Sequence, residues 1–177
     1  MEINSRNISP MPMVLQEKIT GRNDYPLGMA GFGLRGEKSN ELIQPLKNTK
    51  GIVFSGDLDI WGRPAIEMLL STGKLFTYVK AIIDTGAYHT HVNNDIAKQL
   101  GSVSKNEALH RNPVYGDISL PTYMMTYSFK GREDLYFVSD VRGMDFDEDM
   151  LIGAQFLMQF CDLYIYSKEK RFELKFY

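Results

Sequence analysis

From Gly51 to the C-terminus, the chain is a succession of short β-prone runs separated by turn residues. The run at Leu75 to Ile83 is rich in aromatic and β-branched residues, and the turn Ser71 to Lys74 joins it to an alternating run at Ala65 to Leu70. Short strands at such spacing are typical of an all-β sandwich or barrel. We therefore expect a mostly β domain over residues 51–177.

Helical patterns interrupt this domain in two short segments. Asn93 can cap a helix of about two turns that ends at Gly101, and Ala154 to Phe160 can form a second helix. The β-prone runs between and after these segments predict hairpins around three turn signals, which are Gly116-Asp117, Lys130-Gly131-Arg132 and Ser167 to Arg171.

Residues 1–50 have a different texture, because they mix Pro, Gly, Asn, Ser and charge without a sustained period of 2 or 3.6. We expect an N-terminal extension, either an arm on the surface or a prosegment. Gly31 to Gly36 matches the G-x-G-x-x-G pattern, but no convincing strand precedes it and Pro45 limits any helix after it. Dinucleotide binding needs a strand, a turn and a helix there, so a flexible loop is the better interpretation.

Composition argues against several classes of partner. Twenty Lys and Arg face twenty-two Asp and Glu, without a block of like charges, so a nucleic-acid surface is not expected. No apolar run approaches the roughly 18 residues of a membrane span, and the first residues lack a signal-peptide pattern. The single cysteine, Cys161, cannot form an intrachain disulfide. We expect a soluble, cytoplasmic protein with no nucleic-acid or membrane partner.

The feature that carries chemistry is the apolar strand Ala81-Ile82-Ile83, which ends abruptly in Asp84, followed by Thr85 and Gly86. A carboxylate at the tip of a buried strand loses hydration, which is the placement expected of a working acid. Gly86 lets the backbone turn tightly and approach the carboxylate, and Thr85 can hydrogen-bond across a neighbouring loop. An ordinary Asp-Thr-Gly turn explains these three residues equally well when they are considered alone.

A second motif, Met150-Leu151-Ile152-Gly153, lies about 65 residues further along and precedes Ala154-Gln155-Phe156-Leu157. Together with Asp84-Thr85-Gly86-Ala87, it resembles the paired motifs of retropepsin-like and pepsin-like aspartic peptidases. In that family the second strand passes the Asp-Thr-Gly loop, and its glycine leaves room for the active-site backbone. The resemblance covers residues 62–177 and implies a closed β-barrel of the retropepsin or pepsin-lobe type, with Leu151, Ile152 and Gly153 as the supporting strand.

The chemistry of this family needs two carboxylates that share one proton, because two like charges a few ångströms apart cannot both ionise cheaply. The chain has one Asp-Thr-Gly, so we expect a homodimer in which Asp84 of each copy meets the other on a two-fold axis. The resemblance implies an aspartic endopeptidase that acts on polypeptides through an activated water, without a cofactor. The alternative is a non-catalytic dimeric module for peptide binding or assembly, although a scaffold has no need of the intact Asp84-Thr85-Gly86.

In this family a hairpin folds over the substrate as a flap, donates backbone hydrogen bonds and excludes water. Tyr115, Gly116 and Asp117 are the candidates for the tip of that flap, because they mark a turn between two β-prone runs.

Two features depart from the viral members that the chain resembles. An acid after the active-site loop and an arginine after the second motif form a pair there, whereas here those places hold His89 and Ala154. The closing hairpin from Leu163 to Phe176 is longer and more similar to that of a pepsin lobe, which questions a dimer held by interleaved terminal strands. Ala87 cannot donate the hydroxyl hydrogen bond that a serine gives to the ionised carboxylate, so we expect a less acidic optimum than pepsin's.

Other polar and aromatic groups have ordinary interpretations. His89, His91 and Cys161 could begin a zinc site, but no further ligands stand at a defined spacing, and pocket-wall or surface roles fit better. The acidic run from Asp145 to Asp149 lacks the glycine and the closing Glu of a calcium loop. We expect no bound metal, and we assign the tyrosines and Trp61 to the core and to interfaces.

Overall fold

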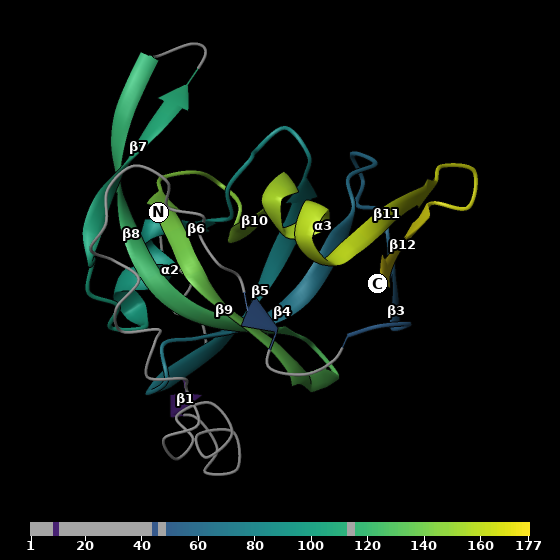
Figure 1. Ribbon diagram of the computed structural model, residues 1–177, viewed down its shortest axis with the longest axis horizontal. Helices are drawn as coiled ribbons and strands as arrows, with labels where there is room; N and C mark the ends of the chain where they lie inside the picture. The colour runs from purple at the N-terminus through teal and green to yellow at the C-terminus, as the bar shows by residue number, and fades with distance from the viewer. Residues whose placement is uncertain (1–8, 11–43, 46–48, 113–115) are drawn as a thin grey trace.

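The computed structural model describes residues 9–10, 44–45, 49–112 and 116–177 (Figure 1). Within these ranges the chain is mostly β with two short helices, so the predicted fold class is confirmed. The strands are β1 (Ser9–Pro10), β2 (Gln44–Pro45), β3 (Val53–Asp57), β4 (Ala65–Ser71), β5 (Leu75–Asp84), β6 (His91–Asn93), β7 (Asn106–Asn112), β8 (Gly116–Phe129), β9 (Arg132–Met144), β10 (Met150–Gly153), β11 (Cys161–Tyr166) and β12 (Arg171–Phe176), and the helices are α2 (Asn94–Gln99) and α3 (Ala154–Phe160).

Six strands close into a mixed barrel in the order β9, β6, β10, β5, β4 and β8, and the pairing of β8 with β9 closes it. β10 lies between β5, to which it is parallel, and β6, to which it is antiparallel. β7 continues the sheet as a hairpin with the first half of β8. A separate sheet contains β11, β12 and β3. Figure 1 shows the β7–β8 hairpin and the β11–β12 hairpin on opposite sides of the barrel.

An aromatic cluster fills the barrel and fixes α3 against it. Phe137 of β9 lies 4.9 Å from Phe156 of α3 and 5.9 Å from Tyr127 of β8, measured between ring centroids. All three side chains are fully buried. Each such ring contributes roughly 1.5–3 kcal/mol by leaving water. This packing sets the position of α3, whose first residue directly follows the supporting strand.

Both helices begin and end as the sequence predicts. The side chain of Asn93 caps α2 by accepting a hydrogen bond of 2.9 Å from the backbone N–H of Asp95. Gly101 follows α2 with φ at +67°, a backbone conformation that glycine adopts without the steric cost of a Cβ. α3 spans the predicted Ala154–Phe160.

The predicted turn at Gly116-Asp117 is wrong. Gly116 pairs with Asn112 and Asp117 pairs with Arg111 in the ladder between β7 and β8. The two strands are instead connected by residues 113–115, which lie outside the described residues. Pairing along the whole length of the hairpin therefore prevails over the local turn preference of a Gly-Asp dipeptide.

The described parts of residues 1–50 are paired to the barrel. Ser9 and Pro10 of β1 pair with the first two residues of β5, at the end of that strand remote from Asp84. β2 pairs with Phe137 and Val138 of β9. The Gly31 to Gly36 motif lies outside the described residues. The division into an extension of residues 1–50 and a domain of residues 51–177 stays a prediction.

In the ranges that the structure describes, no helix is both long and apolar enough to cross a bilayer.

Candidate active site

Asp84 is the last residue of β5, and the sequence explains why the strand can deliver it. β5 is hydrogen-bonded on one edge to β4 and on the other to β10, so Ala81, Ile82 and Ile83 are all buried. A strand enclosed in this way needs a continuous apolar run. The run stops at Asp84, whose side chain is only partly buried and which stands beside Gly153 in the parallel pairing.

The Asp84 carboxylate is oriented by the loop that follows it. The backbone N–H of Gly86 donates a hydrogen bond of 2.8 Å to Oδ1 of Asp84, and the N–H of Ala87 donates one of 3.3 Å to the Asp84 carbonyl. A Cβ at position 86 would lie 3.1 Å from the same Oδ1, which favours glycine there. Thr85 is exposed. One carboxylate oxygen is thus held by the loop while the group stays accessible to a second molecule.

The supporting strand passes against the backbone after the active-site loop. Leu151 and Ile152 pair with Ile82 and Ile83 of β5. A Cβ on Gly153 would lie 2.4 Å from the carbonyl carbon and oxygen of His89 and 2.5 Å from the carbonyl oxygen of Tyr88, so only glycine fits. The room that this glycine leaves is therefore occupied by the Tyr88–His89 backbone.

The beginning of α3 anchors the same loop. The N–H of Ala154 donates to the carbonyl of Ala87 at 2.7 Å, and the N–H of Gln155 donates to the carbonyl of Tyr88 at 2.9 Å. The first helical amides of α3 would otherwise lack intrahelical acceptors. The loop and the helix therefore satisfy each other's backbone groups.

The place of the viral acid–arginine pair holds a different contact. Nδ1 of His89 lies 3.2 Å from Oε1 of Gln155, within hydrogen-bonding distance. Gln155 is buried, with 6% of its surface exposed. A hydrogen bond between an imidazole and an amide thus joins the loop to α3 here. Nothing in the sequence indicated this pairing beyond the nearness of Gln155 to Ala154.

The candidate flap residues lie on the β7–β8 arm, by which we mean β7 and residues 116–122 of β8. Gly116 and Asp117 begin β8, and Asp117 is exposed. Tyr115 lies outside the described residues. The role of these residues in substrate binding stays a prediction.

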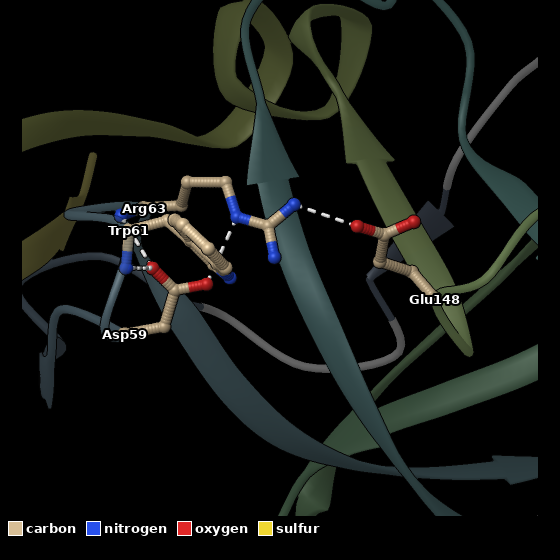
Figure 2. A network of polar contacts seen from close by, with 4 residues as sticks. All are labelled: Asp59, Trp61, Arg63 and Glu148. Carbon is tan, nitrogen blue, oxygen red and sulfur yellow. Dashed lines mark hydrogen bonds and ion pairs between the residues drawn. The ribbon is translucent and has the colours of Figure 1, made fainter.

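A turn that the sequence reasoning missed lies between β3 and β4 (Figure 2). Both oxygens of Asp59 are used there. Oδ1 accepts the backbone N–H groups of Trp61 and Arg63 at 2.9 and 2.8 Å, and Oδ2 accepts Nε of Arg63 at 2.9 Å. Nη1 of Arg63 donates to Glu148 at 2.6 Å. The signal that could have revealed this turn is the Asp and Arg four residues apart around Trp-Gly.

This turn is rigidly joined to the strand that ends at Asp84. The carbonyl of Pro64 accepts the N–H of Ile83 at 2.9 Å. Burial works to raise the pKa of Asp59, but hydrogen bonds from the Arg63 backbone and guanidinium outweigh it and hold the pKa below its usual value. The ring of Trp61 is 74% exposed, so it lies outside the core, and the interface role expected for it stays a prediction.

The other residues considered for metal binding do not converge. Cys161 is buried at the junction of α3 and β11, and burial together with Asp162 raises the pKa of its thiol to about 12. His91 is buried on β6 with 1% of its surface exposed. No group of three or more His, Cys, Asp or Glu side chains positioned to hold a metal ion exists in the part of the chain that the structure describes.

No family model matches this sequence, and no curated protein is similar to it. Solved structures are similar in fold. A retropepsin-like aspartic protease from Rickettsia conorii superposes with a TM-score of 0.50 at 15% identity, over 75% of this chain and 94% of that one.

Two further solved structures match less well. EIAV protease in complex with the inhibitor HBY-793 has a TM-score of 0.44 at 19% identity, over 55% of this chain and 86% of that one. The retroviral protease-like domain of Ddi1 from Leishmania major has a TM-score of 0.42 at 16% identity, over 65% and 94% of the two chains.

Proposed function

We propose that this chain, which has the retropepsin-like fold, is an aspartic endopeptidase whose active site forms between two copies. The observation that carries the proposal is the placement of Asp84. It ends a buried strand, its Oδ1 is oriented by the N–H of Gly86, and the rest of the carboxylate is accessible. Asp84 of each copy supplies one half of the catalytic pair.

The pair acts on a water molecule bound between the two carboxyl groups. It holds one proton, because two adjacent carboxylates do not ionise together. The ionised group takes a proton from the water as it attacks the peptide carbonyl, and the protonated group donates to the carbonyl oxygen. Proton transfer to the leaving nitrogen then breaks the bond, without a covalent intermediate. A single chain contains one such acid, so a second copy completes the chemistry.

Exposed apolar side chains support this dimer, and they lie in the turn that is hydrogen-bonded through Pro64 to Ile83 and in the loop after Asp84. Ile60 is 91% exposed, Trp61 is 74% exposed, and Tyr88 in the loop after Asp84 is 56% exposed. Apolar groups that gather on a surface in this way mark interaction sites. The Asp59–Arg63 turn holds two of them in place before any partner arrives, which lowers the entropy cost of association.

The pairing of β11 and β12 argues against a dimer that is held by interleaved strands from the two copies. β12 is hydrogen-bonded to β11 on one edge and to β3 on the other, all within one chain. It therefore has no free edge to offer a second copy. We place the centre of the dimer interface at the active-site loop and the turn of residues 59–63.

The substrate is a polypeptide that binds beneath the β7–β8 arm. The arm extends beyond the barrel on the side of β6, the strand that follows the active-site loop. In the proposed complex it covers the substrate, donates backbone hydrogen bonds to it and excludes water. Apolar side chains flank the cleaved bond.

Cleavage of a mixed peptide library tests this proposal. Wild type should cleave, and Asp84→Asn should lose activity about a thousandfold or more, because the amide cannot act as the base. Asp95→Asn on the exposed surface of α2 is the matched control and should cleave as wild type does. Sedimentation should show the same dimer for all three proteins. Cleavage by Asp84→Asn, or a dimer that binds peptides without cleaving any, would contradict the proposal.

A further inference from the structure

The three histidines of the chain gather where the β7–β8 arm meets the strand that leaves the active-site loop. The rings of His91 on β6 and His110 on β7 are 5.3 Å apart between centroids, with their planes at 90°. His89 is close enough to lower the pKa of both. The arm therefore contacts β6, the strand that leaves the active-site loop, through the imidazole rings of His110 and His91.

Arg142 of β9 joins this group. It pairs with His91 in the barrel, and its backbone N–H donates to the carbonyl of Thr90 at 3.1 Å. Its guanidinium Nη1 reaches the arm and donates to the carbonyl of Leu109 at 3.1 Å. We call His91, His110 and Arg142 the basic cluster. Arg142 is 7% exposed, so the guanidinium charge lies in a largely desolvated place.

The side chains that shift the pKa of His91 and of His110 carry charge of one sign. Burial, together with the charges of His110, Arg142 and His89, lowers the pKa of His91 to about 4. Burial, Arg142 and His89 likewise lower the pKa of His110. The neighbouring side chains that shift these two imidazoles are thus all basic. A bound anion would relieve this repulsion.

His91 also has unused hydrogen-bonding groups. Neither ring nitrogen makes a hydrogen bond to any residue that the structure describes, although both are buried. The carbonyl of His89 favours the charged imidazole only weakly and is the least of the influences on it. Buried polar atoms in native proteins nearly always have a partner, so this exception calls for one. His110 is only half-buried and gives the cluster access to the surface.

We propose that the basic cluster binds the carboxylate of an acidic side chain in the polypeptide substrate. The inference rests on the proposed function, because it treats the arm as the cover over a substrate cleaved at Asp84. It makes the histidines and Arg142 determinants of specificity, and it adds a charged subsite to the apolar one beside the cleaved bond.

The barrel places this subsite within reach of the bond. Leu151 of β10 pairs with His91, and Gly153 of the same strand pairs with Asp84. Two strand spacings and two residues separate His91 from Asp84, which amounts to roughly 12 Å between their backbones. An extended peptide advances roughly 3.3 Å per residue, so the acidic residue lies within about three positions of the cleaved bond.

The preference for an acidic residue in the substrate should depend on pH in a defined direction. A bound carboxylate favours the charged imidazole, so the pKa of His110 is higher in the complex than in the free protein. The preference is therefore full below the pKa of the free imidazole and is lost as the pH rises through the pKa of the complex. It should be stronger near pH 6 than near pH 8.

Paired peptides that differ only by Glu or Gln near the cleaved bond test the subsite. Near pH 6, wild type should cleave one of the Glu peptides with a kcat/KM about tenfold higher than that of its Gln counterpart. This Glu-to-Gln ratio of kcat/KM should shrink near pH 8. His110→Gln should bring the ratio close to one. His110→Lys should keep the preference and remove its change with pH. Lys98→Gln, which removes an exposed positive charge on α2, should keep the wild-type ratio.

Two results separate this inference from the proposed function. Efficient cleavage with equal kcat/KM for Glu and Gln at all positions within reach would overturn the acidic subsite and leave the peptidase intact. If no peptide is cleaved, the peptidase fails, and proton NMR of the imidazole Hε1 signals decides on the cluster. Capped glutamate, compared with capped glutamine as the probe, should raise the pKa of His110, and identical titrations would overturn the subsite.

Discussion

The active-site loop and the β7–β8 arm are held in opposite ways. Backbone groups fix the loop, since α3 donates to the carbonyls of Ala87 and Tyr88 and Gly153 packs against the loop without a side chain. The arm is a two-stranded ladder in which the described part of β7 pairs with β8 alone. The side chain of Arg142 ties it to the rest of the barrel. The active-site loop, Gly153 and the start of α3 thus form a fixed platform that carries Asp84, whereas the β7–β8 arm is attached to the barrel more loosely.

The largest effect should follow from adding a methyl group at Gly153 in this platform. Gly153→Ala places a Cβ within 2.5 Å of the Tyr88 and His89 carbonyl oxygens. The clash is with backbone, so we expect a loss of about 3 kcal/mol or more in the free energy of unfolding and no measurable cleavage. Gly101→Ala is the control. Its cost should be about 1 kcal/mol, because only the positive φ is violated there. If thermal denaturation showed the same loss of stability for the two variants, the platform would not be tightly packed.

Shortening the arm should separate stability from activity. Residues 110–118 can be replaced by a short glycine turn, because the flanking residues Leu109 and Ser119 are paired neighbours in the ladder. The barrel lies outside this segment, so we expect a small change in the thermal midpoint. Peptide cleavage should fall about a hundredfold or more, since the cover over the substrate is gone. A shortened protein that cleaves as wild type does would show that the arm is not a flap.

Trp61→Ser should weaken the dimer without unfolding the chain. The ring is 74% exposed in the single chain, so its removal leaves the core intact. An aromatic side chain at the centre of an interface commonly contributes about 2 kcal/mol, which predicts a dissociation constant about thirtyfold higher by sedimentation. Val103→Ser removes an equally exposed apolar group elsewhere and should leave the dimer unchanged. Similar effects of the two changes would remove Trp61 from the interface.

The smallest predicted effect concerns Ala87. Ala87→Ser introduces a hydroxyl that can donate to the ionised carboxylate and favour its charged form. The acidic limb of the pH–rate profile should then move to lower pH by roughly half a unit. An unmoved profile would mean that residue 87 does not set the acidic limit.

The same contrast explains what could be predicted from the sequence. The platform is specified by local signals: an apolar run that stops at Asp84, the tight Gly86, and a hydrophobic strand that ends in Gly153. Each of them reports a backbone requirement that few residues can meet. Helix α2 was predictable for the same reason, because Asn93 and Gly101 at its two ends are residues that helix ends favour.

Features that depend on distant partners could not be predicted in this way. The turn was misplaced at Gly116-Asp117, because the pairing of Asn112 with Gly116 extends the ladder past the local signal. The contact of Arg63 with Glu148 joins residues far apart in the chain, and so does that of His91 with His110. Contacts of this kind become visible only once the barrel has folded.

Mixing wild type with Asp84→Asn tests most directly whether two copies share one active site. The two proteins should form mixed dimers that lack one of the two acids. With the wild-type concentration held fixed, an equal amount of the variant should lower the cleavage rate to about half, because random pairing halves the number of intact pairs. A rate that stays proportional to wild type alone, whatever amount of variant is added, would contradict the shared site.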